Sequence, residues 1–269
     1  MAMKSVRLDG KVIVVTGATQ GIGESVAIAC AESGAAGVCL GGRDARRGAQ
    51  VQARLAALGC DALFVQGDLA READCRHLVT CAVQRYGNLH GLVNSAGLTD
   101  RGTIEDTSVA MWDRLFSVNV RAPFVLTQEF VRVTKAAALA GSIVNISSRS
   151  SRAGPPFLTA YASTKGALVT LTRNNAHALR RRRLRVNAIN VGWTDTPGEQ
   201  DIRRREGQAP GWAERAGRTL PFGRLLDPAD VSTLVVYLLS DAAEMMTGSI
   251  IDFDQNVIGA YGSDTHPPI

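Results

Sequence analysis

The feature that most constrains this chain is the alternation of short apolar runs with longer amphipathic stretches along nearly its whole length. The first run, KVIVVTG at 11–17, is rich in β-branched residues, as buried strands are. A helical stretch at 21–33 and a second apolar run at 36–42 follow, and the pattern then repeats. Such alternation favours a parallel sheet joined by right-handed crossovers, with helices on both faces.

The alternation predicts the elements in order. Strands are expected over 11–17, 36–42, 61–68, 89–97, 141–148, 184–190 and 248–254. Helices are expected over 21–33, 44–58, 71–86, 108–135, 159–180 and 228–240. We therefore predict an α/β protein, with a single-domain, Rossmann-like doubly wound fold over 1–269 and a seven-stranded parallel sheet. Residues 192–222 lack strand character, which is typical of a substrate loop or lid.

Composition limits the partners and the compartment. The formal net charge of +5 comes largely from arginine clusters at 180–185 and 203–205, which we interpret as solvated surfaces. No zinc spacing or basic-aromatic pattern accompanies them, so we predict no nucleic-acid partner and no metal site. No apolar run approaches about 18 residues, which predicts no membrane span. Five cysteines without a CxxC pair, and an N-terminus interpreted as a strand rather than a signal peptide, indicate a cytoplasmic protein.

A glycine-rich turn, TGATQGIG at 16–23, joins the first strand to the first helix. Gly17, Gly21 and Gly23 permit a tight turn and a close approach of backbone to ligand. The helix that follows presents its free N–H groups and the positive end of its dipole at the same place, which suits a pyrophosphate. The GxxxGxG spacing differs from the GxGxxG fingerprint, but its position predicts a nucleotide site.

The end of the second predicted strand bears on which dinucleotide binds. A carboxylate there binds the ribose 2′-OH of NAD, whereas a nearby arginine accommodates the 2′-phosphate of NADP. Here the strand ends in Gly41, Gly42 and Arg43, with no carboxylate before Asp44. Arg43 could pair with a phosphate or could simply be an exposed arginine at a helix start, and Asp44 is expected to cap that helix. We predict that NADP(H) is favoured and that NAD(H) is possible.

The stretch AYASTKGAL at 160–168 places Tyr161 and Lys165 four residues apart, so the two side chains share a helix face. A base that removes an alcohol proton near neutral pH needs a pKa well below the ~10 of a free phenol. At ~4 Å and an effective dielectric of ~20, a lysine cation attracts a phenolate by on the order of 4 kcal/mol, or roughly three pK units. We therefore expect Lys165 to lower the pKa of Tyr161, and the small neighbouring residues leave room for a cofactor.

Two further polar residues accompany this pair. Ser148 ends the strand predicted at 141–148, at the edge where open α/β sheets bind ligands, so its hydroxyl could bind the substrate oxygen. Asn119 lies within the helix predicted at 108–135, although asparagine is an indifferent helix former. Its side chain could hold a water or a backbone carbonyl and extend a proton path from Lys165, or it could be purely structural.

Together these motifs resemble those of the short-chain dehydrogenase/reductase family, whose TGxxxGxG turn and YxxxK pair they match in order over nearly the whole chain. The resemblance implies a catalytic tetrad of Asn119, Ser148, Tyr161 and Lys165. It implies a cofactor site made by Gly17, Thr19, Gln20, Gly21, Ile22, Gly23, Arg43, Asp68, Leu69, Asn94, Ala96, Gly97, Tyr161, Lys165, Gly192, Thr194 and Thr196. In that site Asp68 would bind adenine and Thr196 the nicotinamide carboxamide.

The chain departs from the family pattern at three places. NSAG at 94–97 has Ser95 where the family has a second asparagine. VGWTDT at 191–196 resembles the family's PGxxxT, but Val191 replaces the proline and leaves the turn less rigid. FDQNVIGA at 253–260 stands where the family normally ends in VDGG, so we expect a different last turn.

The resemblance implies an NAD(P)-dependent oxidoreductase that interconverts a secondary alcohol and a ketone by hydride transfer. Tyr161 would be the general acid/base, Lys165 would also bind the nicotinamide ribose, and Ser148 would orient the substrate oxygen. A 3-oxoacyl thioester reductase is the main alternative. A non-catalytic nucleotide-binding scaffold and a nucleic-acid binder that uses the arginine clusters are weaker alternatives, since neither needs the tetrad.

The segments expected around the substrate are 98–102, 149–157 and 192–222. They are rich in arginine and carry few large apolar groups: Arg101, Arg149, Arg152, Arg203, Arg204, Arg205, Arg215 and Arg218, with Phe157, Trp193 and Trp212. We predict a small, polar alcohol or carbonyl substrate that could be anionic: a sugar, a polyol or a sugar-derived acid. The family resemblance also implies a homotetramer, or a homodimer, formed through the helices at 108–135 and 159–180.

Overall fold

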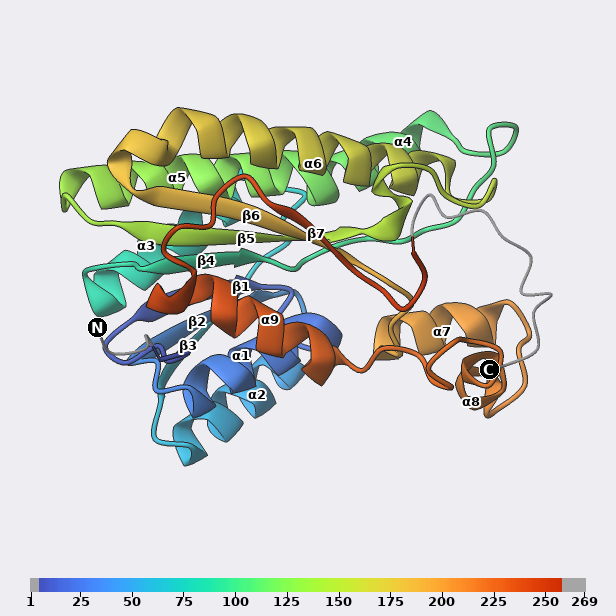
Figure 1. Ribbon diagram of the computed structural model, residues 1–269, viewed down its shortest axis with the longest axis horizontal. Helices are drawn as coiled ribbons and strands as arrows, with labels where there is room; N and C mark the ends of the chain where they lie inside the picture. Colours follow the sequence, from blue (N-terminus) through green and yellow to red (C-terminus); the bar gives the residue numbers. More distant parts are fainter. Residues whose placement is uncertain (1–4, 258–269) are drawn as a thin grey trace.

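The computed structural model of the chain describes residues 5–257 and contains one seven-stranded sheet in the order β3-β2-β1-β4-β5-β6-β7 (Figure 1). Every neighbouring pair of strands is parallel. The strands are β1 (Val12–Thr16), β2 (Gly37–Gly42), β3 (Asp61–Gln66), β4 (Gly91–Asn94), β5 (Gly141–Ser148), β6 (Leu184–Val191) and β7 (Ile250–Phe253). The predicted doubly wound α/β fold is confirmed for the described residues; 1–4 and 258–269 of the predicted domain lie outside them.

Helices cover both faces of the sheet (Figure 1). One face carries α1 (Gly21–Glu32), α2 (Ala45–Ala57) and α9 (Pro228–Leu239). The other carries α3 (Glu72–Tyr86), α4 (Val109–Phe116), α5 (Ala122–Ala136) and α6 (Thr159–Leu179). In β1, Ile13 and Val15 pack into the core on the α1 side, while Val12 and Val14 pack into the core on the α3 side. Because both faces are covered, β1 is an uninterrupted apolar run rather than an alternating one.

The helix predicted over 108–135 is continuous in direction but not in hydrogen bonding. A π-helical turn, η1 (Ser117–Arg121), separates α4 from α5. Asn119 lies inside this turn and is almost completely buried. Single π-turns inside α-helices occur frequently at functional sites, because the extra residue redirects one side chain. The apolar periodicity of the segment did not reveal this insertion.

The strand predicted over 89–97 is shorter than expected. β4 ends at Asn94, because the N–H groups of Ser95 and Ala96 donate to Oγ1 of Thr16 (3.0 and 3.1 Å) instead of to a neighbouring strand. The chain after β4 is thereby held against the glycine-rich turn that follows β1. The last strand is also shorter than predicted, at Ile250–Phe253.

The segment 192–222, predicted to be irregular, contains two short helices, α7 (Pro197–Arg205) and α8 (Trp212–Gly217). Figure 1 shows them beyond the end of the sheet at which β6 finishes. Thr196 caps α7 by accepting from the N–H of Glu199, and Pro197 occupies the first turn, where its missing N–H costs nothing. The prediction missed α7 because its residues are almost all charged or polar and carry no apolar period. Among the described residues, no helix is long and apolar enough to cross a membrane.

Candidate active site

A cavity of about 1090 Å³ lies at the carboxyl ends of the strands, where the strand order reverses between β1 and β4. Open α/β sheets bind ligands at this point. The lining includes every predicted cofactor residue except Asn94, and it includes Ser148 of the predicted tetrad. Asn119 and Asn94 do not line it.

The glycine-rich turn is built for close backbone approach. Gly17 adopts a φ of 65°, and a Cβ at this position would lie 2.8 Å from the backbone of Ala96. A Cβ at Gly23 would lie 2.3 Å from the carbonyl oxygen of Gly17. A side chain at Gly17 would therefore push the turn away from the loop after β4, and one at Gly23 would push α1 away from the turn itself. The turn and the N-terminus of α1 form the floor of one half of the cavity.

The ends of β2 and β3 supply charge to the same half of the cavity. Arg43 is exposed and lines the cavity, and Asp44 caps α2 as expected, since its Oδ1 accepts from the N–H of Arg47 (2.9 Å). Arg47 also lines the cavity and donates to Oε1 of Gln20. Sequence reasoning missed Arg47, although its place one helical turn after Arg43 could have indicated a second cation here. Two arginines at this end suit an additional phosphate.

Asp68, which follows β3, is held as a carboxylate. Its Oδ1 accepts from the N–H of Ala70 (3.0 Å) and its Oδ2 accepts from Arg114 (3.1 Å). Burial raises the pKa of Asp68, but these two hydrogen bonds lower it, and the net pKa lies below its ordinary value. The Asp68 carboxylate is therefore a fixed hydrogen-bond acceptor at the cavity wall, and it could accept from the amine of an adenine.

Tyr161, Lys165 and Ser148 meet in the other half of the cavity. α6 carries the first two and β5 ends at the third. Nζ of Lys165 lies 5.6 Å from the centroid of the Tyr161 ring and donates to the carbonyl of Ile146 (2.9 Å). The hydroxyl of Ser148 accepts from the N–H of Ser150 (3.1 Å), and it lies near enough to the Tyr161 phenol to influence the pKa of that group. The sequence-predicted triad is therefore brought together.

The expected lowering of the Tyr161 pKa is not found. Burial raises this pKa, the Ser148 hydroxyl lowers it and the carboxylate of Glu199 raises it, so the net pKa lies above its ordinary value. Lys165 is itself buried, and burial lowers its pKa from 10.5 to about 8. The estimate from two charges at ~4 Å was wrong, because it omitted the desolvation of the phenol and the ammonium.

Asn119 holds the loop after β4. Its Nδ2 donates to the carbonyl of Leu98 (2.9 Å) and to Oγ1 of Thr164 (3.0 Å), and its Oδ1 accepts from the N–H of Leu98 (2.8 Å). Asn94 is also buried; it donates to Asn145 (2.8 Å), while its own Oδ1 has no hydrogen-bond partner among the described residues. Both asparagines support the site from behind the cavity wall.

The turn after β6 closes the cavity. A Cβ at Gly192 would lie 2.6 Å from the carboxyl group of Asp254, so the turn packs tightly against the end of β7 despite Val191 standing where the family has proline. Thr194 donates to the carbonyl of Gly192 (3.1 Å). The last turn, expected to differ from the family's VDGG, begins with Asp254, Gln255 and Asn256. Residues 258–260 of this stretch lie outside the described part of the chain.

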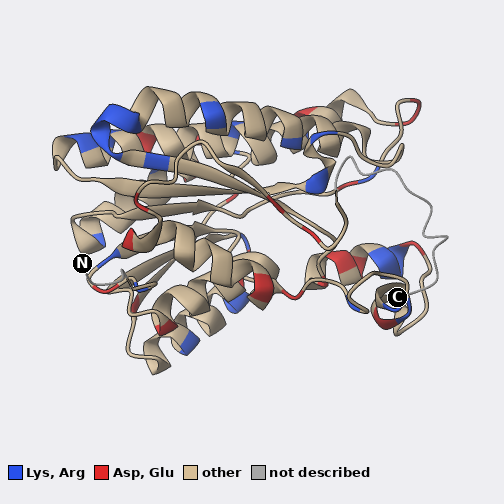
Figure 2. Cartoon of the chain, viewed as in Figure 1, with Lys and Arg blue, Asp and Glu red and all other residues tan. Residues whose placement is uncertain are grey.

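Most of the arginines expected to surround the substrate are engaged elsewhere. Of the eight, only Arg101, Arg149 and Arg203 line the cavity. Each pairs with carboxylates: Arg101 and Arg203 with Glu199 and Glu206, and Arg149 with Asp254. Figure 2 shows acidic and basic residues along α7 and α8. These three arginines therefore offer little uncompensated positive charge to an anionic substrate.

Glu199 is, like Arg47, a cavity residue that sequence reasoning missed. It lies in the first turn of α7 and lines the cavity together with Tyr161 and Trp193. The sequence Thr196-Pro197, a capping residue followed by proline, could have indicated a helix start there and placed Glu199 within it.

The residues present fit a dinucleotide. The glycine-rich turn leaves backbone N–H groups free at the N-terminus of α1. Arg43, Arg47 and the carboxylate of Asp68 lie at one end of the cavity, and Tyr161, Lys165 and Ser148 lie at the other. Among the described residues, no group of three or more His, Cys, Asp or Glu side chains could hold a metal ion.

Comparison with known proteins points the same way. A family profile described as Enoyl-(Acyl carrier protein) reductase matches residues 17–255. The 2-(S)-hydroxypropyl-CoM dehydrogenase 3 of Xanthobacter autotrophicus is 35% identical over 255 residues, which cover 92% of this chain and 96% of that one. The NADP-dependent (R)-specific alcohol dehydrogenase of Lentilactobacillus kefiri is 34% identical over 246 residues, covering 90% and 94%.

A solved structure is similar over nearly the same length. The crystal structure of a proposed NAD(P) dependent gluconate 5-dehydrogenase from Beutenbergia cavernae, with NADP bound at low occupancy, has a TM-score of 0.84 and 32% identity. The match covers 93% of this chain and 97% of that one. The chain therefore belongs to the short-chain dehydrogenase/reductase family. It is an oxidoreductase that binds a nicotinamide cofactor and acts on alcohol or ketone groups.

Proposed function

We propose that this enzyme interconverts a secondary alcohol and a ketone on a small polar substrate, such as a sugar, a polyol or a sugar-derived acid, with NADP(H) as its preferred cofactor. The observation that carries the proposal is the meeting of Tyr161, Ser148 and Lys165 in one cavity with the glycine turn. Charged side chains such as Arg101 and Glu199 line the substrate half beside large apolar ones, among them Phe157 and Trp193. The gluconate dehydrogenase assignment of the Beutenbergia neighbour supports a substrate of the sugar-acid class.

The three side chains divide the work of proton transfer. The bound nicotinamide supplies the hydride acceptor or donor. The Ser148 hydroxyl binds the substrate oxygen, and the Tyr161 phenol exchanges a proton with it. The raised pKa of Tyr161 keeps the phenol neutral near pH 7, which suits it to donate a proton during ketone reduction. The Lys165 ammonium stabilises the phenolate that forms after donation, and Asn119 holds Leu98 beside this centre.

We also propose which residues of the cavity bind each part of the cofactor. Gly17, Thr19, Gln20, Gly21, Ile22 and Gly23 would hold the pyrophosphate, Arg43 with Arg47 the 2′-phosphate, and Asp68 with Leu69 the adenine. Gly192, Thr194 and Thr196, with Ala96 and Gly97, would border the nicotinamide. The Lentilactobacillus relative, named as NADP-dependent, supports the preference.

The test of the proposed reaction is Tyr161→Phe, which removes one hydroxyl and preserves the ring. Because the phenol is the proposed proton donor, we expect kcat to fall by at least about a hundredfold, while NADPH binding measured by fluorescence changes little. Tyr237→Phe removes a phenol elsewhere and is the matched control. Turnover of Tyr161→Phe at the wild-type rate would refute the assignment.

A 3-oxoacyl thioester reductase remains the second candidate. The observation that favours it is the match of residues 17–255 to a family described by an acyl-carrier-protein reductase. The carboxylate pairs around Arg101 and Arg203 disfavour it, because a carrier protein would need free cations at the entrance. Reduction of acetoacetyl-CoA faster than of any small polyhydroxy ketone would make it the better assignment.

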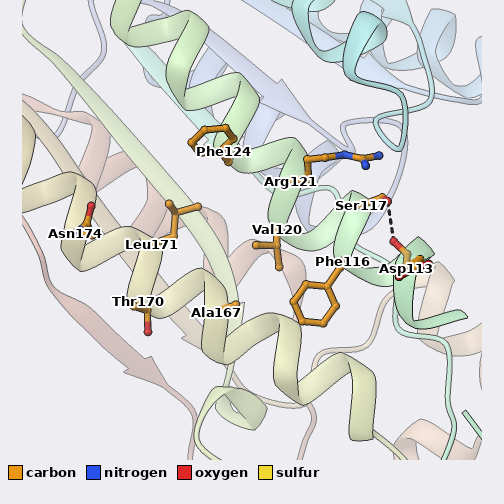
Figure 3. A pocket seen from close by; sticks show the side chains of 10 residues that line it. All are labelled: Asp113, Phe116, Ser117, Val120, Arg121, Phe124, Ala167, Thr170, Leu171 and Asn174. Carbon is orange, nitrogen blue, oxygen red and sulfur yellow. Dashed lines mark hydrogen bonds between the residues drawn. The ribbon is translucent and has the colours of Figure 1, made fainter. Parts of the chain in front are cut away.

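Self-association is proposed from a second cavity of about 870 Å³ between the α4–α5 segment and α6 (Figure 3). Its apolar lining includes Phe116, Val120, Phe124 and Leu171, and Phe124 is 48% exposed. An open apolar groove along two helices fits a second copy of the chain, so we propose a homodimer or homotetramer. We also propose that 192–222 acts as a substrate lid and that the enzyme is cytoplasmic.

A further inference from the structure

Glu199 is held in place more firmly than any other acid of the cavity. Its Oε1 accepts three hydrogen bonds, from Arg101 (3.2 Å), from the indole of Trp193 (3.0 Å) and from Arg203 (2.9 Å). The guanidinium of Arg203 also lies 4.9 Å from the Trp193 ring centroid. These contacts come from the loop after β4, the turn after β6 and α7 itself, so the carboxylate is fixed from three sides.

The second oxygen of this carboxylate is not used in the same way. No described residue donates a hydrogen bond to Oε2, and this atom is not among the sealed, unpartnered atoms of the structure, so it is open to the cavity although the side chain is only 17% exposed. Glu199 lines the cavity together with Tyr161 and Ser148, and its charge acts on the Tyr161 phenol. A mostly buried acceptor that lacks a donor is costly unless a ligand or water supplies one.

The charges around Glu199 select the kind of donor. Arg101 and Arg203 are balanced by Glu199 and Glu206, so this wall is close to neutral overall. The carboxylate of Glu199 would repel an anionic group of a substrate. A cationic amine would face Lys165 and both arginines. A neutral hydroxyl both supplies the missing hydrogen bond and avoids either repulsion.

We propose that Oε2 of Glu199 accepts a hydrogen bond from a second hydroxyl group of the substrate, and that this contact makes the enzyme selective for diols and polyols over simple alcohols. The proposal rests on the function proposed above, since it assigns the substrate class of the same site. An acceptor at this place discriminates strongly against an analogue that lacks the hydroxyl, because the bound analogue displaces water from Oε2 and supplies no hydrogen bond in return.

The test compares two pairs of alcohols that differ by one hydroxyl: 2,3-butanediol with 2-butanol, and 2,4-pentanediol with 2-pentanol. We expect kcat/KM of the wild-type enzyme to favour the diol of at least one pair by about tenfold or more. In Glu199→Gln, Arg101, Trp193 and Arg203 would hold the amide oxygen, so the NH₂ group would replace Oε2 and present a donor. We expect the diol preference to fall about tenfold in this variant.

Glu206→Gln is the matched control. Glu206 pairs with the same two arginines but does not line the cavity, so this variant should keep the diol preference within about threefold. A merely structural effect of Glu199→Gln would slow both members of a pair alike and leave their ratio unchanged.

The outcomes separate the two proposals. Equal wild-type kcat/KM for diols and simple alcohols, an unchanged ratio in Glu199→Gln, or an equal loss in Glu206→Gln would each overturn the role of Glu199 and leave the proposed reaction standing. Absence of turnover of every alcohol and of the matching ketones would overturn the proposed reaction, and the role of Glu199 with it.

Discussion

Lys165, to which we assign a role in proton transfer, is a buried cation, and burying its charge costs the fold stability. Lys165 is 5% exposed, and within residues 5–257 its ammonium donates one hydrogen bond, to the carbonyl of Ile146. Burial disfavours the charged form and lowers the pKa to about 8. The group is therefore the residue at which we expect the stability of the protein to depend most clearly on pH.

The direction of that dependence follows from proton binding. Below about pH 8 both the folded and the unfolded chain carry the proton, whereas between 8 and 10.5 only the unfolded chain keeps it. The unfolded state then binds more protons, so stability rises with pH in this window. We expect the wild-type free energy of unfolding, measured in urea, to gain roughly 2 kcal/mol between pH 7.5 and 10 relative to Lys165→Met. Parallel curves for the two proteins would contradict the buried-cation account.

Arg43 is the residue at which the cofactor preference can be tested. A hydrogen bond between charged groups contributes about 1.5–3 kcal/mol, so Arg43→Ala should reduce the ratio of NADPH to NADH affinity by about tenfold or more. The ratio is measured by fluorescence titration of each cofactor. Arg46→Ala is the control, because Arg46 is exposed three residues later, in the first turn of α2, but does not line the cavity. An equal fall of the affinity ratio in both variants would show that the overall positive charge of the region, and not a contact of Arg43, sets the preference for NADPH.

The sequence indicated some of these residues and not others, for physical reasons. Tyr161, Lys165 and Ser148 could be found because a helical spacing and a strand end fix where they lie. The pKa of Tyr161 could not, because desolvation depends on packing that no spacing reveals. The way Glu199 is held could not either: Trp193 and Arg203 are near it in sequence, but its third donor, Arg101, is 98 residues away along the chain.

Among the elements, the glycine turn between β1 and α1 is the one whose geometry tolerates least change. Gly17 combines a left-handed backbone with a Cβ position that would lie 2.8 Å from Ala96. The turn and the loop after β4 are therefore fitted to each other, and a side chain at Gly17 would displace one of them.

Gly10 offers a control that separates the two effects. Its φ of 74° resembles the 65° of Gly17, but nothing lies within 4 Å of its Cβ position. Both alanine variants should lose about 1 kcal/mol of stability from left-handed strain. Only Gly17→Ala should weaken NADPH binding, by about tenfold or more, as measured by titration calorimetry. Unaltered binding in that variant would show that the turn can relax.

The elements themselves were largely predictable, because β-branched runs and amphipathic periods record burial directly. The parallel direction of the strands β1 to β7 follows from their alternation with helices. The π-turn at Ser117–Arg121 was not predictable, since one inserted residue changes the hydrogen bonding without breaking the apolar pattern. α7 was not predictable from apolar spacing, since caps and charges define it.

At the scale of the whole molecule, the groove beside α5 and α6 predicts self-association. Phe124→Lys places a charge in this groove, which an apolar interface cannot bury without a large cost. We expect the variant to elute as a smaller species, checked by light scattering coupled to size-exclusion chromatography. Leu58→Lys is the control, because Leu58 is 49% exposed and Phe124 48%. A wild-type protein that is monomeric at micromolar concentration would contradict the prediction.

The place of β1 in the sheet has a consequence for how the chain is made. β1 pairs with β2 on one side and with β4 on the other, so Val14 must find Leu92 before both sides are closed. No adjacent pair can form as a hairpin, because all are parallel. A nascent chain that has emerged only as far as β3 therefore exposes a bare strand edge, prone to aggregation. Refolding should accordingly be slow, and recovery should improve at low protein concentration or with a chaperone.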